Sequence, residues 1–413
     1  MRLPLWANAL AATLMVQIVS AFASTTVPLL GPPLMEQAGL PAESIGIVSA
    51  MTSGGICWFL ACGGPMLNHH GAVRSLQIGL ACVAIGLLVL SQPLGVFGLA
   101  GALVIGFGVA PNTPAGSQIL NRTAPPRHRS LVFSIKQAGV PLGGALAGLV
   151  VAPLALAHGV PAAFGIVIAL VLVTIAVVQP FRRQLDGMRG SGSPGWARAL
   201  LSAVELARSL KSLRSHPSLP LLTALGASFS TLQACLNAFI ATYVVTRHGA
   251  SLAEAGRLVA AMLFASMTGR IVLGWLSDRA AGRALLMLTV QAVVSALAVA
   301  LLVALAGYGS WARYACVIIA GFTAIGWNGV HMAELARVAP PRLVGEVTSA
   351  ASLFGFLGSV CGPLAFTLVV GWSGSYPLAF GLAAGQLALF GLVTLVFLRH
   401  SARGRPGPGS GTV

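Results

Sequence analysis

Long apolar runs follow one another along the chain, and polar residues gather in the short stretches between them. Charges and clusters of Pro, Gly or Asn divide the runs into twelve segments of about 20 to 30 residues, each long enough to cross a hydrocarbon core of roughly 30 Å. Lipid leaves only helices and closed barrels as spanning structures, and the low density of alternating polar residues argues against a barrel. The sequence therefore predicts an all-α integral membrane protein with twelve transmembrane helices. The predicted spans are residues 9–35, 44–67, 72–91, 95–120, 130–156, 160–181, 218–246, 252–276, 284–307, 311–336, 343–370 and 376–398.

An internal repeat relates the first half of the chain to the second. Gly106-Phe107 and Arg122-Thr123-Ala124-Pro125-Pro126-Arg127 recur as Gly321-Phe322 and Arg337-Val338-Ala339-Pro340-Pro341-Arg342, every position displaced by 215 residues. A repeat of this kind predicts two pseudo-symmetric six-helix halves around a central cavity, with the substrate site between the halves.

One long hydrophilic stretch, residues 182–217, separates the sixth predicted span from the seventh. We therefore expect an N-terminal half in residues 1–181, a linker in 182–217, a C-terminal half in 218–399 and a tail in 400–413. Within the linker, residues 196–214 place apolar side chains at helical spacing and basic ones elsewhere around the helix, as in a helix that lies on a membrane surface. A solvated helical linker fits the same pattern.

Charge supports this topology. Only 8% of the residues are charged, mean hydropathy is +0.89 and the net charge is +16. Most basic residues fall on the side of both termini, and the opposite loops hold only Arg247, Arg257 and Arg313, so the positive-inside rule predicts cytoplasmic termini in a cell inner (plasma) membrane. With two lysines and four tyrosines, the chain lacks the basic, aromatic face that binds nucleic acid. The first apolar run is too long for a cleaved signal peptide and is expected to be a span.

The inventory of reactive residues argues against an enzyme. The six cysteines form no C-x-x-C pair, and the chain has no H-E-x-x-H, G-x-S-x-G or phosphate-loop motif. Adjacent His69 and His70 lack a third ligand at metal-binding spacing. We expect no metal, no cofactor and a monomer; a membrane-bound enzyme and a transporter-like sensor are the minor alternatives.

Gly274-Trp275-Leu276-Ser277-Asp278-Arg279, followed by Gly282-Arg283, resembles the signature loop of the major facilitator superfamily, with one extra residue before the second glycine. Together with the repeat and the central linker, this resemblance covers essentially the whole chain and implies a transporter that works by alternating access. It assigns Asp278 and Arg279 to a gate that closes the cytoplasmic side, where a carboxylate meets a helix N-terminus. The first-half copy has Asn68 in place of the aspartate, so we expect a weaker lock there.

The substrate class follows from weaker resemblances. Residues 134–137 (Ser-Ile-Lys-Gln), together with Arg270, are similar to the superfamily's small-anion and carboxylate carriers, in which a cation in span 8 binds the anionic head of the substrate. The alternative is a drug/proton antiporter that exports lipophilic compounds. It is disfavoured because span 4 has no arginine and residues 139–144 match the antiporters' glycine motif with a spacing error of one.

Three ionisable residues remain at membrane depth, where such residues are rare and indicate function: Lys136, Arg270 and His331. Lys136 lies seven residues inside span 5 and Arg270 eight residues inside span 8, about 10 to 12 Å from the boundary at 1.5 Å per residue. We therefore expect the two cations to hold one anionic substrate between the halves. His331 is the candidate for proton coupling, since its ordinary pKa is near 6.5. A structural histidine, and uniport or exchange without protons, stay open.

Uncharged polar residues concentrate in spans 1, 4, 7 and 10, which line the cavity in this superfamily. The same spans contain prolines whose freed backbone groups need partners, so part of this polar set is expected to be structural. The expected substrate-binding residues are Lys136, Arg270, Asn112, Thr113, Gln17, Gln233, Asn237, Trp327 and Asn328.

Overall fold

A computed structural model of the chain describes residues 4–62, 66, 69–92, 98–125, 129–186, 211–279, 283–305, 309–340 and 344–403, and this part contains helices and no strand. Asn68 and most of the predicted linker helix (residues 196–210) lie outside these residues. The helices of the first half are α1 (Leu5–Leu29), α2 (Gly31–Gln37), α3 (Ile45–Cys62), α5 (Ala72–Leu90), α6 (Gly98–Val109), α7 (Asn112–Thr123), α8 (Arg129–His158) and α9 (Val160–Val178). After the short α10 (Arg182–Leu185), the second half has α13 (Ser218–His248), α14 (Leu252–Arg279), α15 (Ala284–Ala304), α16 (Gly309–Ala320), α17 (Asn328–Val338), α18 (Val344–Ser373) and α19 (Tyr376–Arg403).

The predicted transmembrane spans are confirmed as helices. Within the described residues, 11 helical segments are long and apolar enough to cross a membrane. Helices α6 and α7 are 12 residues each and follow one another as a single interrupted span, which brings the described spans to the predicted twelve.

Spans 4 and 10 are both broken near their middle. Pro111 separates α6 from α7, and a proline has no N–H to continue the helix. In the second half a five-residue π-helix, η6 (Gly321–Ile325), joins α16 to α17. The displacement of 215 residues places Pro111 on Gly326, directly after η6, so the two halves are interrupted at the same point. Irregular backbone at membrane depth is tolerated where protein buries it or where it lines a cavity.

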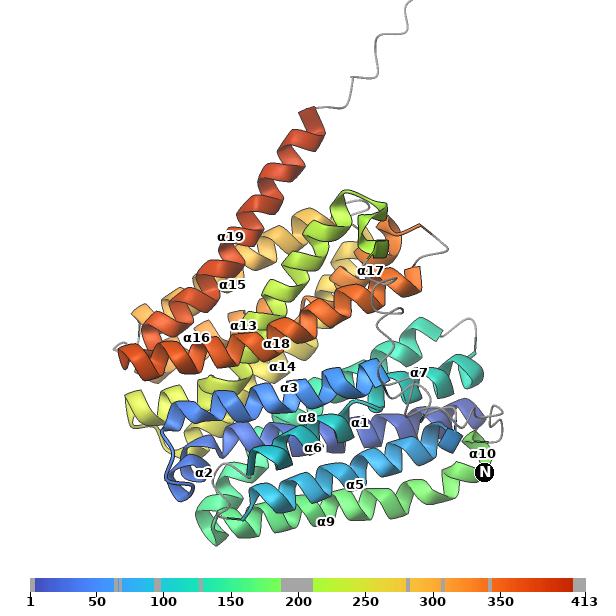
Figure 1. The fold of residues 1–413 in the computed structure, drawn as a ribbon, viewed down its shortest axis with the longest axis vertical. Helices are drawn as coiled ribbons and strands as arrows, with labels where there is room; N and C mark the ends of the chain where they lie inside the picture. The colour runs from blue at the N-terminus through green and yellow to red at the C-terminus, as the bar shows by residue number, and fades with distance from the viewer. Residues whose placement is uncertain are drawn as a thin grey trace, which may run out of the picture.

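The two halves repeat their internal packing. Helix α1 packs on α8 as α13 packs on α18, and α5 packs on α6 as α15 packs on α16. Between the halves, α8 packs on α14 and α3 on α18, and Figure 1 shows these pairs side by side at the middle of the molecule. The boundary between the halves is therefore built mainly from two helix pairs.

Glycines bring these helix pairs together on one side of the molecule. We call the side where α9 ends and α13 begins the linker face, and the opposite side the far face. A Cβ at Gly148 on α8 would lie 2.5 Å from the carbonyl oxygen of Gly256 on α14, and a Cβ at Gly46 on α3 would lie 2.6 Å from that of Pro363 on α18. Close backbone approach of this kind requires small residues. Gly148, Gly256 and Gly46 lie toward the far face, so the halves are closed there.

Candidate functional site

A cavity of about 200 Å³ lies between the two halves. Helices α1 and α8 from the first half and α13, α14 and η6 from the second supply its walls. It is lined by Ala21, Ser24, Thr25, Pro28, Val140, Pro141, Gln233, Asn237, Val259, Leu263, Ser266, Arg270 and Ile325. Because both halves contribute walls, movement of one half against the other changes access to this cavity.

A second cavity, also of about 200 Å³, lies on the other side of the contact between α1 and α13. Its walls come from α1, α3, α13 and α18. The two cavities share Ser24, Pro28, Gln233 and Asn237, so we treat them as two lobes of one central site. Gln233 and Asn237 are one helical turn apart on α13 and face both lobes, in agreement with their expected place in the cavity wall.

Arg270 is the charged residue in the lining of the first lobe. Its Nε is buried and has no hydrogen-bond partner among the described residues, and no acidic residue lines either lobe. Ser266 lies one turn earlier on α14, also lines the lobe, and has a buried hydroxyl for which the described part of the chain offers no partner. Sequence reasoning missed Ser266, although its spacing of four from Arg270 places both on one helix face.

Trp327 supports the cavity wall from behind. Its indole is buried, lies stacked on Phe229 with ring centroids 5.2 Å apart, and donates from Nε1 to Gln233 Oε1 at 2.9 Å. Trp327 is not part of the lining of either lobe. It therefore contacts a cavity residue and does not itself form the cavity surface.

Lys136 is in a different place from Arg270. Its side chain is 2% exposed, and Nζ donates to the backbone carbonyl of Asn112 at 2.9 Å and to Gln137 Oε1 at 3.4 Å. Gly116 makes room for it, since a Cβ there would meet Lys136 Cε at 2.8 Å. Lys136 and Asn112 line neither lobe. This structure does not bring the two cations together on one cavity surface; Lys136 instead holds the backbone at the break in span 4.

The remaining polar residues expected at the site are also outside the lining of both lobes. Gln17 is buried where α1 meets α8, and its Oε1 has no partner among the described residues. Thr113 is exposed and Asn328 is half-buried. Ser24 and Thr25, on the same helix as Gln17, do line the first lobe. The sequence thus identified the polar helices more reliably than the individual side chains.

His331 packs against α13. Its Nε2 lies 2.9 Å from the carbonyl oxygen of Leu222, and because a carbonyl only accepts, Nε2 carries the proton. The imidazole occupies the space left by Gly226, where a Cβ would meet Nε2 at 2.5 Å. His331 is buried, and it lines neither lobe. Proton coupling through His331 stays a prediction, and its contacts are those of a packing residue.

The predicted gate is described in part. Asn68 and the side chain of Asp278 lie outside the described residues, and Arg279 is exposed with its guanidinium 3.8 Å from the Trp275 ring centroid. A different carboxylate caps a helix at the linker face. Asp186, just after α10, accepts from the backbone N–H groups of Val73 and Arg74 at 2.8 and 3.2 Å, at the start of α5. No sequence pattern indicates this contact, which joins residues 113 positions apart.

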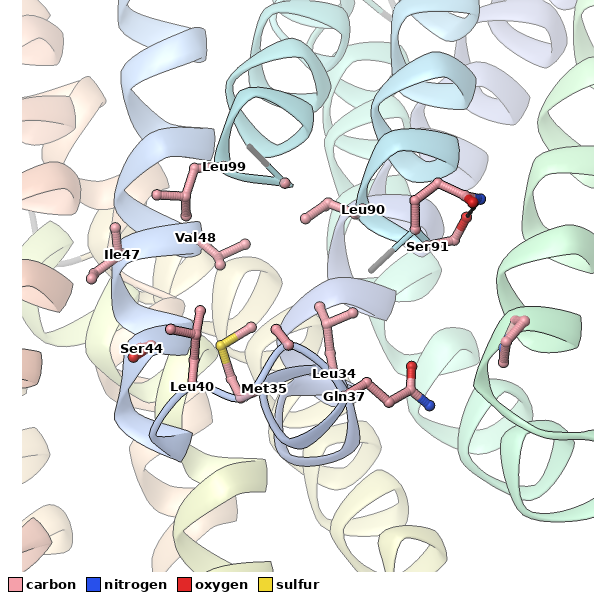
Figure 2. Close-up of a pocket in the computed structure, with 14 residues that line it drawn as sticks. Leu34, Met35, Gln37, Leu40, Ser44, Ile47, Val48, Leu90, Ser91 and Leu99 are labelled. Carbon is pink, nitrogen blue, oxygen red and sulfur yellow. Dashed lines mark hydrogen bonds between the residues drawn. The ribbon is translucent and has the colours of Figure 1, made fainter. Parts of the chain in front are cut away.

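A further pocket, of about 420 Å³, is apolar and lies near the far face. Figure 2 shows its walls, which come from the first half alone and include Leu34, Met35, Leu40, Val48, Leu90 and Leu99. It lies within one half, so relative movement of the halves does not expose it first to one side and then to the other. The central lobes are therefore the better candidate for a transport site.

Comparison with known proteins agrees with this architecture. Residues 13–360 match the family model of the Major Facilitator Superfamily. An uncharacterized MFS-type transporter of Mycobacterium tuberculosis is 27% identical over 358 residues, which cover 85% of this chain and 76% of that protein. A probable nitrate/nitrite transporter of the same species is 34% identical over 131 residues, covering 30% of this chain and 31% of that protein. A hexuronate transporter of Bacillus subtilis is 26% identical over 148 residues, 34% of each.

The fold is also found among solved structures. A peptide transporter, POT, crystallised in complex with sulfate, matches with a TM-score of 0.78 over 96% of this chain and 95% of that chain, at 16% identity. This likeness concerns the fold alone. The family match extends over most of the chain, in which two six-helix halves enclose a central cavity. The chain belongs to the Major Facilitator Superfamily and is a multi-pass membrane transporter.

Proposed function

We propose that this transporter moves a small organic or inorganic anion, with a carboxylate as the first candidate, across the membrane by alternating access. The observation that carries the proposal is Arg270, a cation in the central cavity with no acidic residue in the cavity lining. A buried charge is costly unless it is paired, and an anionic substrate supplies the missing partner. The same charge repels lipophilic cations, which disfavours the export of cationic drugs.

Neighbouring groups suit an anion. Arg270 offers a planar fork of N–H donors that matches carboxylate and nitrate oxygens. Ser266 and Asn237 add uncharged hydrogen-bonding groups, and Val140, Leu263 and Ile325 form apolar walls that strengthen the electrostatic attraction. Two relatives that match about a third of the chain are named as nitrate/nitrite and hexuronate transporters, and this supports an anionic substrate.

We propose Lys136 as a second cation that acts in another conformation. In this structure it is bound to the Asn112 carbonyl, so it would have to leave that carbonyl to reach the substrate. Lys136→Gln keeps a donor for Asn112 but removes the charge. If one cation from each half binds the substrate, Lys136→Gln should weaken anion binding by about tenfold, as the loss of one charged hydrogen bond does. Lys136→Arg should retain anion binding. Unaltered binding in Lys136→Gln would leave Lys136 as a support of the span 4 break.

The orientation follows from the charge distribution. Basic residues concentrate at the linker face, so we place that face and both termini in the cytoplasm. Closure at the far face then excludes access to the cavity from outside the cell in this conformation. Symport, uniport and exchange all remain compatible with this cycle, and a comparison of uptake with and without an imposed pH gradient distinguishes them.

The direct test is binding by the purified protein in lipid nanodiscs. Nitrate, acetate and glucuronate are titrated, with glucose as the uncharged counterpart of glucuronate. We expect at least one of the three anions to bind, glucose to fail, and Arg270→Gln to abolish binding. Arg257→Gln is the matched control, because Arg257 is on the same helix, exposed and outside the cavity. Anion binding that survives in Arg270→Gln, or tight binding of an organic cation by the wild type, would refute the proposal.

A further inference from the structure

We infer that Trp327 fixes which end of the Gln233 amide faces the central cavity, and that this makes the cavity selective for anions that carry no proton donor. The inference rests on the proposed function and names a specificity within it. It assigns Trp327 as a positioning residue, which acts through Gln233 and does not touch the substrate.

The indole of Trp327 is held on several sides. Phe229 lies parallel to it, with 5.2 Å between ring centroids and 12° between the planes, and His331 meets it edge-on at 5.0 Å. Phe229 and Gln233 are one turn apart on α13, so a single helix supplies both the stacking surface and the hydrogen-bond acceptor. Trp327 is 3% exposed. The indole therefore has little freedom to turn its N–H away from Gln233.

The chemistry of the pair fixes the amide. An indole N–H is only a donor, whereas a glutamine amide has an oxygen that accepts and a nitrogen that donates. The bond of 2.9 Å from Trp327 Nε1 must therefore end on Gln233 Oε1. Since the oxygen is engaged by an indole that does not line the lobes, we expect the NH₂ group on the other side of the amide to face the lobes that Gln233 lines. A glutamine without this hydrogen bond could flip its amide and so present either the oxygen to a donor or the nitrogen to an acceptor.

The first lobe thus contains two groups that only donate, the Arg270 guanidinium and the oriented Gln233 NH₂. Nitrate and a deprotonated carboxylate present only acceptors to them. Bicarbonate has the same charge and planar shape as nitrate but carries one O–H, which neither group accepts; this O–H must turn toward Asn237 or a hydroxyl of the lining, so bicarbonate offers the two donors fewer acceptor oxygens than nitrate does. Polar groups left unpaired in a site discriminate strongly between otherwise similar ligands.

The test compares nitrate with bicarbonate in nanodiscs at a slightly alkaline pH in closed vessels. We expect the wild type to prefer nitrate, and Trp327→Phe, which keeps the ring on Phe229 but removes the N–H, to reduce that preference by about fivefold, within the range of one hydrogen bond. In a Gln233→Met background, Trp327→Phe should cause no further change. Trp311→Phe is the control substitution, since Trp311 is 73% exposed at the start of α16.

A ligand-free measurement makes the outcomes distinguishable. In protein labelled with ¹⁵N-tryptophan, the Trp327 indole resonance is the one of seven that Trp327→Phe removes, and we expect it to move in Gln233→Met. If this resonance does not move, or if Trp327→Phe alters the nitrate preference equally with and without Gln233, the inference is overturned while Arg270-dependent binding stands. If none of nitrate, acetate, glucuronate and bicarbonate binds to the wild type, the proposed function fails and this specificity with it; if a carboxylate binds but the wild type does not prefer nitrate over bicarbonate, only this specificity is overturned.

Discussion

Gly148 on α8 and Gly256 on α14 meet backbone to backbone across the boundary between the halves. A Cβ on Gly148 would lie 2.5 Å from the Gly256 carbonyl oxygen and 3.0 Å from the Ala260 nitrogen. Both neighbours are backbone atoms that cannot rotate away. The far-side closure of this conformation therefore depends on the absence of a side chain at this crossing.

Gly148→Leu should accordingly favour the conformation that is open at the far face. Overpacking at a tight contact costs about 1–3 kcal/mol, which raises the ratio of open to closed molecules by about 5- to 150-fold. In a variant without the native cysteines, Asn237→Cys should then react faster with a membrane-impermeant thiol reagent added from outside. Gly165→Leu is the control, because a Cβ there has nothing within 4 Å. Equal labelling rates in the two leucine variants would contradict the role of this contact.

Asp186 should stabilise the linker face of the first half. Its carboxylate accepts two N–H groups at the start of α5 and lies 3.7 Å from the Arg182 guanidinium. Loss of an N-terminal cap costs about 0.5–2 kcal/mol, so Asp186→Ala should lower the melting temperature of the purified protein by a few degrees. Glu36→Ala removes an exposed carboxylate of α2 and serves as the control. Equal melting temperatures in both variants would show that the cap contributes nothing.

His331→Gln should leave the pH dependence of transport as it is in the wild type. The imidazole faces Leu222 and Gly226 on α13 and lines neither lobe, so its expected contribution is packing. Uptake into liposomes is measured with and without a pH gradient, and the melting temperature reports the packing loss. Loss of the pH dependence in the variant, with substrate exchange retained, would instead identify His331 as the proton carrier.

Asp278 and Asn68 offer a test of the cytoplasmic gate. They occupy corresponding positions in the two signature loops, and only Asp278 has a carboxylate to place at a helix N-terminus. We expect Asp278→Asn to reduce the initial transport rate severely, by about tenfold if one such interaction of about 1.4 kcal/mol is lost. Asn68→Asp should be tolerated or slow the opening of that side. Equal, mild effects of the two substitutions would refute the assignment.

The sequence predicted the order and approximate length of the membrane-spanning helices, since the positions and lengths of the apolar runs determine both. It placed Lys136 and Arg270 at one depth, and it identified Gln233 and Asn237 as cavity residues. It could not establish the direction in which a side chain leaves its helix. Apart from Ser130 and the run of residues 134–137, span 5 is apolar, so nothing in its pattern indicates that Lys136 turns toward Asn112 and away from Arg270.

Contacts that depend on the absence of a side chain also could not be predicted from the sequence. Lys136 has room because of Gly116, and His331 has room because of Gly226. Each pairing joins two different helices, and a glycine in a single sequence does not reveal which neighbour fills its space. The capping contact of Asp186 could not be predicted for a related reason, since its partners are backbone groups more than 100 residues earlier in the chain.

The breaks in spans 4 and 10 differ in one respect that affects the transport cycle. Pro111 has no N–H, so the hydrogen bond that is missing at this break in the first half cannot form in any conformation. Each of the five residues of η6 keeps its N–H, and a π-helix can rewind by exchanging bonds to the fifth preceding carbonyl for bonds to the fourth. Rewinding would turn α17, with Trp327 and His331 at its start, about the helix axis. The break in the second half can therefore change its hydrogen bonding during the transport cycle, whereas the break in the first half cannot.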